Sequence, residues 1–261
     1  MTIVKHELRQ GKVSFWVWTI SIAFLMAVCI CLFPEIKTQM EGFTKFYSSL
    51  GVFTAAFGMD KLNFGTLMGY YAIECGNVLG LGGAFFAALC AVSILSKEEK
   101  GRTAEFLLAH PVSRTRIVTE KLVAVFIQIV VMNVIIFAVS VGTIVVIKEP
   151  VPWKDLSLLH FAYLIMQVEL ACICFAISAF TRKGGAGIGL GIAAIMYFLN
   201  IIANISKSAA FLKYITPFGY CDGADIIPNG RMNAGMTAVG IGISVVCIIA
   251  AYVKYLKKDI H

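Results

Sequence analysis

The most charged segment of this chain contains two adjacent glutamates, Glu98 and Glu99, followed by Arg102. Paired glutamates with an arginine four residues later, E-E-x-x-x-R, can activate water for peptide cleavage, because a carboxylate can act as a general base. Here the arginine comes one residue too early. The four histidines also fall outside the centres of the long apolar segments, so none completes such a site. These residues predict a protein that is not an enzyme.

One acidic residue, Glu169, stands near the middle of a long apolar segment. A carboxylate at the centre of a bilayer costs at least about 2.5 kcal/mol unless it is paired, hydrated or protonated, so we expect it to face protein or water. Three roles stay open for it: a structural hydrogen bond, a place in the lining of a transport pathway, or a proton relay. The other polar residues predicted to line a pathway are Asn133, Asn200 and Asn204.

The sequence contains no pattern for binding a nucleotide or a metal ion. No G-x-x-x-x-G-K-[ST] loop is present, and Gly11-Lys12 lacks both the preceding glycine and the hydroxyl residue that would bind magnesium. The cysteines of the C-x-C pairs, such as Cys29 and Cys31, are two residues apart, and on a helix such side chains project to opposite sides. We therefore expect no cofactor and no metal site in this chain.

Composition places the chain in a membrane. Apolar residues make up 59% of it and charged residues only 14%. Six apolar runs have about 20 residues or more, the length that spans a hydrocarbon core of roughly 30 Å. They cover residues 14–33, 69–95, 117–147, 158–180, 185–205 and 236–256. The predicted fold class is an all-α integral membrane protein with six transmembrane helices, and residues 1–261 form a single transmembrane domain.

Lysine and arginine set the expected orientation, because positively charged loops remain on the cytoplasmic side of a membrane. An even number of spans places both termini on one side. Most of the 22 basic residues then gather in the terminal segments and in the connections after the second and fourth spans. This predicts a multi-pass protein of the cell membrane with both termini in the cytoplasm. The formal charge of +7 follows from the same distribution and forms no contiguous patch, so we expect no nucleic-acid partner.

Two segments outside the predicted spans have patterns of their own. Residues 1–12 mix apolar and charged positions at helical spacing, which predicts an amphipathic elbow helix in the inner interface, with Val4 and Leu8 on its apolar face and Glu7 on another. Residues 207–233 contain prolines, glycines and an apolar stretch. This pattern predicts short outer helices that re-enter the bilayer, where their broken backbone is buried in protein.

A third segment, residues 97–116, joins the second and third spans. Its first residues are mostly charged, and an apolar patch of Ala104, Phe106, Leu107 and Leu108 follows, which predicts a short helix over residues 98–109 with one charged and one apolar side. Pro111 ends this helix, and Ser113 is expected to cap a new helix that continues into the third span. That span is about 31 residues long, or roughly 46 Å at 1.5 Å per residue, so its inner end is expected to protrude from the membrane.

The same segment resembles the inner loop of ABC-2-type exporter permeases, which has the pattern E-x-G-T-x-E-x-L-L-x-x-P-x-S-R-x-x-I-x-x-x-K. Arg102 is inserted after the glycine of this pattern. Two further segments resemble the family, H-E-L-R at 6–9 and I-T-P-F-G-Y at 215–220. Agreement of topology extends the resemblance over essentially the whole chain. The loop pattern is matched at Glu99, Gly101, Thr103, Glu105, Leu107, Leu108, Pro111, Ser113, Arg114, Ile117 and Lys121.

The resemblance implies a permease subunit without its own ATPase site. The helix predicted over residues 98–109 would be the coupling helix, which docks in a cleft of a separate ABC ATPase subunit that binds ATP and Mg²⁺. A second permease copy, identical or paralogous, would complete the pathway through the lipid bilayer. The residues expected to couple to the ATPase are Glu98, Glu99, Gly101, Arg102, Thr103, Glu105, Phe106, Leu107, Pro111 and Arg114.

Three functional hypotheses follow. The first is an ATP-driven exporter, and the compact build, the absence of a large outer domain and an aromatic-rich helix expected after the first span favour an amphipathic peptide or a hydrophobic drug as its substrate. The alternative is an ion-coupled secondary transporter that uses Glu169 and needs no ATPase. A membrane scaffold or sensor that transports nothing also fits the composition.

Overall fold

The computed structural model describes residues 2–39, 51–101, 112–181 and 185–258, without the side chains of Val52, Phe53, Glu99 and Lys100. Every regular element in these ranges is a helix. Six helices are long and apolar enough to cross a membrane, so the predicted all-α fold with six transmembrane helices is confirmed. They are α2 (Lys12–Thr38), α5 (Leu67–Ala91), α8 (Arg114–Val146), α9 (Trp153–Phe180), α10 (Ala186–Ile205) and α12 (Ala234–Lys257).

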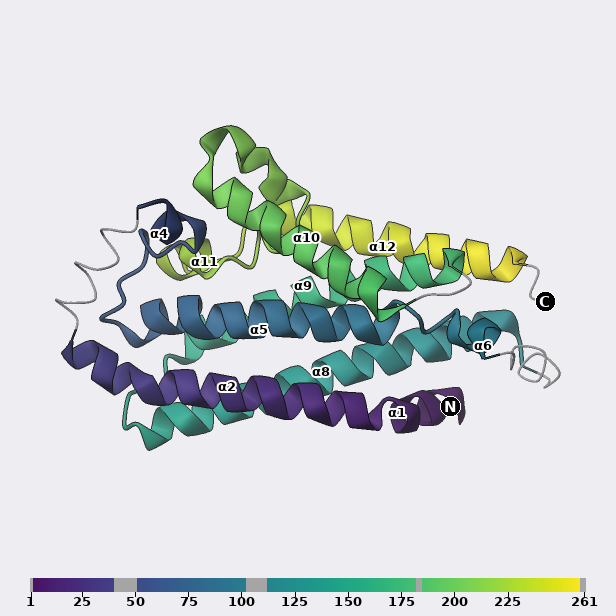
Figure 1. The fold of residues 1–261 in the computed structure, drawn as a ribbon, viewed down its shortest axis with the longest axis horizontal. Coiled ribbons are helices and arrows are strands. Elements are labelled where there is room, and N and C mark those ends of the chain that lie inside the picture. Colours follow the sequence, from purple (N-terminus) through teal and green to yellow (C-terminus); the bar gives the residue numbers. More distant parts are fainter. Residues whose placement is uncertain (1, 40–50, 102–111, 182–184, 259–261) are drawn as a thin grey trace.

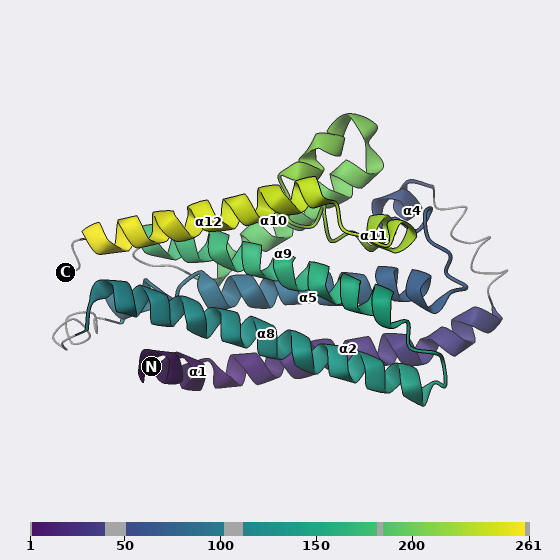
Figure 2. The same cartoon turned by 180° about the vertical axis from the view of Figure 1, so that it is seen from behind.

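The long helices form an elongated bundle, and both chain termini lie at the same end of it (Figure 1). We call this end the terminal end and the opposite end the far end. The short helices α1 (Thr2–Gln10) and α6 (Lys97–Lys100) lie at the terminal end. The far end holds α4 (Val52–Ala56), the 3-10 helix η1 (Lys207–Tyr214) and α11 (Gly223–Asn229), and Figure 2 shows the same division from behind.

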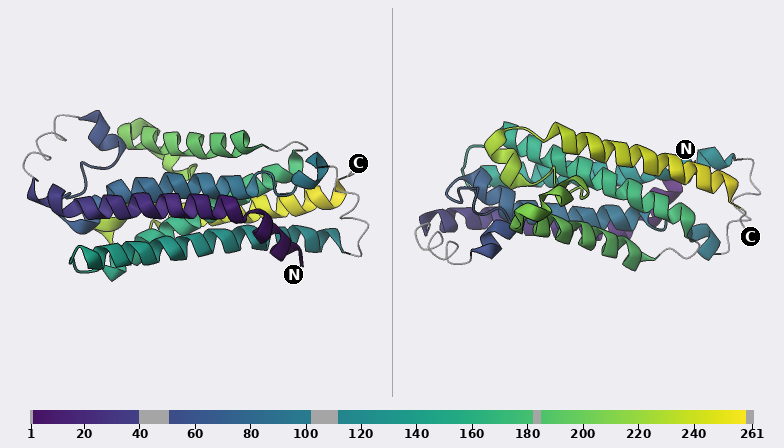
Figure 3. Two further views of the ribbon diagram at one scale, coloured as in Figure 1. Left: turned by 60° about the horizontal axis from the view of Figure 1, so that its bottom comes forward. Right: turned by 90° about the horizontal axis from the view of Figure 1, so that it is seen from above.

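Helices α5, α8 and α9 form the centre of the bundle. Helix α9 packs against α5 and α12, and α2 packs against α5 and α8. Helices α10 and α12 bury few residues and lie on the same side of the bundle (Figure 3). Their exposed side chains include Ile195, Phe198 and Val246. Such apolar surfaces suit contact with lipid, because lipid tails are as apolar as the side chains themselves.

Three of the six long helices, α5, α8 and α12, begin at a polar side chain that caps them. Ser113 accepts a hydrogen bond from the Arg116 amide at the start of α8, as predicted, and Thr66 caps α5 in the same way through Gly69. These bonds satisfy amides that have no partner within the helix. Helix α8 has 33 residues, which is about 50 Å at 1.5 Å per residue. It is therefore longer than a hydrocarbon core requires.

The segments outside the spans agree with their predicted positions in part. Helix α1 occupies the place of the predicted elbow helix, but the placement of Glu7 was wrong: this side chain is 4% exposed and faces α8. Its burial follows from a contact with a distant lysine, which helical spacing does not reveal. Helices η1 and α11 are short helices within 207–233. Their re-entry into the membrane, and the position of α1 in the interface, stay predictions.

The helix predicted over 98–109 is described only at its beginning. Residues Lys97–Lys100 form α6, and Gly101 forms an exposed turn. Residues 102–111 lie outside the described part of the chain. Residues 40–50, which hold the middle of the aromatic-rich helix expected after the first span, also lie outside it. Both helices therefore stay predictions.

Gly69 provides a test of the packing at the start of α5. A Cβ at this position would overlap the backbone carbonyl of Asn63. We expect Gly69→Ala to destabilise the protein by about 1–3 kcal/mol, because a backbone atom cannot rotate out of the way. Gly142→Ala on α8 is the matched control, since nothing lies within 4 Å of its Cβ position. Thermal unfolding in one detergent should show a lower melting temperature for the first variant only; equal values would contradict the packing described here.

Candidate functional site

A fully buried lysine on α8, Lys121, stands at the centre of a group of charges at the terminal end. Its ammonium donates hydrogen bonds to Glu7 Oε1 on α1 and to the carbonyl of Ile94, each at 2.8 Å, and also to Glu98 on α6. Lys97 on α6 donates to Glu7 as well. We call Glu7, Lys97, Glu98 and Lys121 the charged cluster. It joins α1, α6 and α8.

The charged cluster contains two cations and two anions, so its formal charges cancel. Removing an ion from water costs several kcal/mol, and this cost is offset only where the ion is paired and hydrogen bonded. Burial acts to raise the pKa of Glu7, but the ammonium groups of Lys121 and Lys97 outweigh it and hold this pKa below its ordinary value of 4.5. Glu7 is therefore ionised at neutral pH, and the cluster is held by charge-assisted bonds.

The residue before Lys121 holds the beginning of α1. Glu120 accepts hydrogen bonds from the backbone amides of Ile3 (3.0 Å) and Val4 (3.3 Å), and Arg116 donates to the same carboxylate at 2.8 Å. Amides in the first turn of a helix have no partner within it, and a negative charge there also interacts favourably with the helix dipole. Two consecutive residues of α8 therefore bind both turns of α1.

The beginning of α8 also contacts the end of α12. Arg114 Nη1 donates hydrogen bonds to the carbonyls of Lys258 (2.6 Å) and Leu256 (3.3 Å), and Thr119 and Tyr252 share a hydrogen bond of 2.7 Å. The last carbonyls of a helix have no partner within it, and a basic side chain can satisfy them. The structure thus places Arg114, which was predicted to couple to an ATPase, against the end of α12.

The remaining residues of the predicted coupling set are placed only in part. Glu98 belongs to the charged cluster, and Gly101 lies in an exposed turn. Their coupling role, like that of the whole set, stays a prediction. The members outside the described residues are the Glu99 side chain, Arg102, Thr103, Glu105, Phe106, Leu107 and Pro111.

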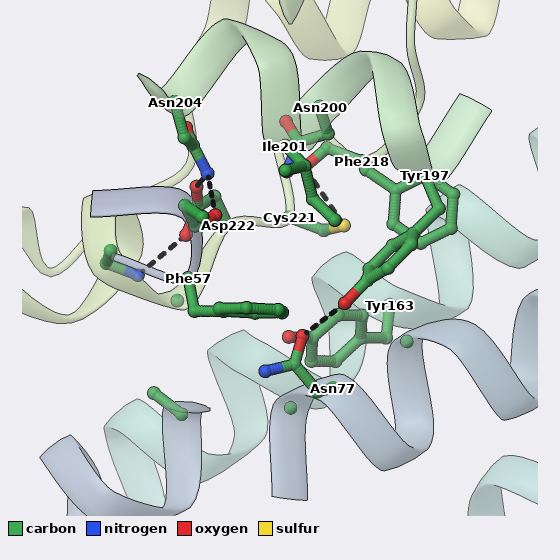
Figure 4. Close-up of a pocket in the computed structure, with 16 residues that line it drawn as sticks. Phe57, Asn77, Tyr163, Tyr197, Asn200, Ile201, Asn204, Phe218, Cys221 and Asp222 are labelled. Carbon is green, nitrogen blue, oxygen red and sulfur yellow. Dashed lines mark hydrogen bonds between the residues drawn. The ribbon is translucent and has the colours of Figure 1, made fainter. Parts of the chain in front are cut away.

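A small cavity of about 40 Å³ lies at the far end, between α5, α9, α10 and the residues that lead into α11 (Figure 4). Asn200 and Asn204, one turn apart on α10, both line it. Asn204 Nδ2 donates to Asp222 Oδ2 at 3.0 Å, and the Tyr197 hydroxyl donates to Asn77 Oδ1 at 3.0 Å. Two of the four predicted pathway residues therefore meet in one cavity.

The other two pathway candidates lie within the bundle and do not line this cavity. Asn133 on α8 donates to Gln167 Oε1 on α9 at 2.7 Å. Glu169, which is 2% exposed, accepts a hydrogen bond of 2.6 Å from the Tyr220 hydroxyl, and α12 packs so closely that a Cβ at Gly240 would overlap the Glu169 carboxylate. The structural hydrogen bond considered for Glu169 is therefore present.

Several residues of these sites were not among the predicted functional residues. Glu120 and Lys121 did carry a signal, because two charges within an apolar run need partners inside the protein. Lys121 also matched the loop pattern but was not assigned a role. Glu7 and Asp222 carried no comparable signal. Each is recognised as part of a site only in the folded structure, where a residue distant in the sequence contacts it.

A comparison with protein families adds evidence independent of the geometry. The family model described as "ABC-2 family transporter protein" matches residues 1–260. This match covers all six long helices, the charged cluster and the far-end cavity. A comparison with curated proteins returns no match.

The charged cluster predicts a strong effect for Lys121→Met. This variant removes the ammonium and keeps an unbranched, flexible side chain. We expect it to destabilise the protein by about 3 kcal/mol, the lower end of the range for breaking a buried ion pair, because Lys97 still neutralises part of the cluster. Lys5→Met, at an exposed position of α1, is the matched control and should change stability by less than about 0.5 kcal/mol. Thermal unfolding of both variants checks this, and similar losses in the two would rule out a central role for Lys121.

The lowered pKa of Glu7 predicts that the attachment of α1 depends on pH. Because the ionised form is favoured in the folded state, its contribution is fully present above about pH 5 and is lost as the pH falls through the folded-state pKa. Hydrogen exchange should therefore show α1 amides losing protection relative to α12 as the pH falls from 6 to below 4. Glu7→Gln should show weaker protection and a smaller change with pH, because Glu120, which accepts hydrogen bonds from the Ile3 and Val4 amides, then still titrates against α1. A wild-type response equal to that of Glu7→Gln would contradict this assignment.

Proposed function

The chain belongs to the ABC-2 family of transporter proteins and is a membrane permease component of an ABC transporter, and we propose that it is an exporter permease that couples to a separate ATPase subunit through residues 97–116. ATP and Mg²⁺ bind to that subunit, and this chain supplies the pathway and the coupling element. The single observation that carries the proposal is the charged cluster, which bonds the beginning of this segment to two other helices.

The proposed orientation places the terminal end in the cytoplasm. Both termini and α6 lie at this end (Figure 1). Lysine and arginine are concentrated in the segments that meet there, and such segments are retained on the cytoplasmic side during insertion. The coupling segment then lies where a soluble ATPase subunit can reach it. The far-end cavity lies on the outer side.

The bonds around the coupling segment suit the transmission of movement. The segment begins at α6, where Lys97 and Glu98 belong to the charged cluster, and it leads into α8, where Arg114 binds the end of α12. A push on the segment would therefore reach α1, α8 and α12 through charge-assisted bonds. In this proposal Phe106 and Leu107 anchor the helix in the ATPase cleft. The charges that pair with the cleft are Glu99, Arg102 and Glu105.

We propose two permease copies, identical or paralogous, with two ATPase subunits. The apolar surfaces of α2, α10 and α12 leave room for a second copy beside the lipid contact that a membrane helix needs. For the substrate we propose an amphipathic peptide or a hydrophobic drug. Support comes from the aromatic residues Phe57, Tyr163 and Tyr197 at the far-end cavity. The position of Glu169 is accounted for by its bond to Tyr220, which requires no coupled ion.

The coupling proposal predicts the behaviour of the chain with its ATPase. The chain is purified in lipid nanodiscs together with the ABC ATPase encoded beside its gene, and ATP hydrolysis is measured. We expect stable association of the wild type. For Glu105→Arg combined with Phe106→Ala we expect at least about a tenfold fall in hydrolysis, since losing an anchor and reversing a charge together cost more than about 1.4 kcal/mol at an interface.

The matched control is Asp60→Arg, which reverses an exposed acidic charge in the connection between α4 and α5. It should leave both association and hydrolysis unchanged. If no ATPase associates with the wild type, the proposed function is wrong. If the double variant and the control lower hydrolysis equally, the effect does not come from the coupling segment.

A further inference from the structure

The far-end cavity contains buried amide oxygens that no described residue satisfies. Asn200 is 8% exposed, and neither its Oδ1 nor that of Asn204 has a hydrogen-bond partner within residues 2–39, 51–101, 112–181 and 185–258. The two residues are four positions apart on α10, so their side chains lie on one face of the helix. Buried polar groups in folded proteins are nearly always hydrogen bonded, and a group left without a partner calls for an explanation.

The cavity also carries a negative charge close to these oxygens. The side chain of Asp222 is 9% exposed, and its carboxylate accepts hydrogen bonds from Asn204 Nδ2 and from the Ala224 amide, each at 3.0 Å. The Lys213 ammonium forms an ion pair with Asp222 at 3.7 Å and donates a hydrogen bond of 2.7 Å to Asp225, so its charge is shared between the two carboxylates. Asn77 adds another amide oxygen to the lining. A carboxylate with amide oxygens around it favours a positively charged occupant.

Aromatic rings form another part of the lining. Figure 4 shows Phe57 and Tyr163 on one side of the space and Asn200 and Asp222 on the other. The rings of Tyr197 and Phe218 meet edge to face, with their centroids 5.4 Å apart. The face of an aromatic ring attracts organic cations, and cages of such rings recognise ammonium groups. Charge, hydrogen-bond acceptors and aromatic faces therefore occur together in one cavity.

We propose that the far-end cavity binds the ammonium group of a cationic amphipathic substrate. This inference rests on the proposed export function and narrows its substrate class to molecules that carry an amine. Asp222 supplies the opposite charge, Asn200 and Asn204 accept the N–H bonds, and Phe57 and Tyr197 face the alkyl part of the head group. At about 40 Å³, the cavity holds only a few groups of the size of water, so the apolar remainder of the substrate lies outside it.

Sodium and potassium ions share the charge of an ammonium group, and the aromatic lining is what favours the organic cation. The probe is therefore benzylammonium, with benzyl alcohol as its uncharged analogue of similar shape. Binding of each is measured by saturation-transfer NMR on the full chain in nanodiscs, without an ATPase. We expect the wild type to bind benzylammonium at least tenfold more tightly than benzyl alcohol.

Asp222→Asn tests the charge with little disturbance of the fold. Asp222 caps α11 through the Ala224 amide, and asparagine caps a helix as well as aspartate does. This variant should lose the tenfold preference. Asp60→Asn removes an exposed acidic charge at the same end of the bundle and should keep the preference. Asn200→Ala is a second variant that leaves α11 untouched, and it should weaken benzylammonium binding several-fold.

Four results would overturn this inference: no binding of benzylammonium by the wild type, equal binding of the two probes, an unchanged preference in Asp222→Asn, or the same loss in Asp60→Asn. Sodium binding that depends on Asp222 and excludes benzylammonium would assign the cavity to an inorganic ion and would also overturn it. Failure of the proposed function is distinguishable, because it appears in the ATPase measurement. If no ATPase associates with the chain but benzylammonium still binds, the proposed exporter function is rejected and the assignment of the cavity as an ammonium site is retained.

Discussion

The terminal end of the bundle depends on one buried ammonium group. Lys121 has no exposed surface, yet each of the three N–H groups of its ammonium has an acceptor. These acceptors are Glu7, Glu98 and the carbonyl of Ile94. An ammonium has three donors and no acceptor, so this set satisfies it completely. The cost of removing the charge from water is offset only while α1, α6 and the turn after α5 stay in place around α8. The position of the segment that follows α6 is set by the same requirement.

Contacts continue from this end of the molecule to the other through α12. Arg114 binds its last carbonyls at the terminal end, and α9 packs along its length. Closer to the far end, Gly240 leaves room for the Glu169 carboxylate, which binds Tyr220. Tyr220 is two residues from Asp222 in the far-end cavity. Helix α12 therefore contacts groups at both ends of the bundle through packing and hydrogen bonds.

The far end is held by ion pairs rather than by one buried charge. Asp225 on α11 accepts hydrogen bonds from Lys61 at 2.9 Å and from Lys213 at 2.7 Å, which connects three separate segments. Lys61 and Asp225 are 48% and 42% exposed, so solvent screens their pair, whereas Lys213 is only 12% exposed. The Lys61–Asp225 pair is therefore worth less than the charged cluster. The contrast fits the proposed coupling at the terminal end and the proposed binding of substrate at the far end.

Hydropathy alone was sufficient for the six membrane helices and the all-α class, because each span must satisfy its own backbone and bury its own apolar surface. The orientation expected from the charges stays a prediction. The pattern at 97–121 was also sufficient to indicate the family. Spacing could not predict that Glu7 is buried, nor that Asn200 and Asn204 share a cavity with Asp222 while Asn133 and Glu169 do not. Those facts depend on which helices become neighbours, and a polar residue in an apolar helix signals the need for a partner without naming it. Packing of α1 against α8 gave Glu7 its lysine partner, and the residues that lead into α11 brought Asp222 to Asn204.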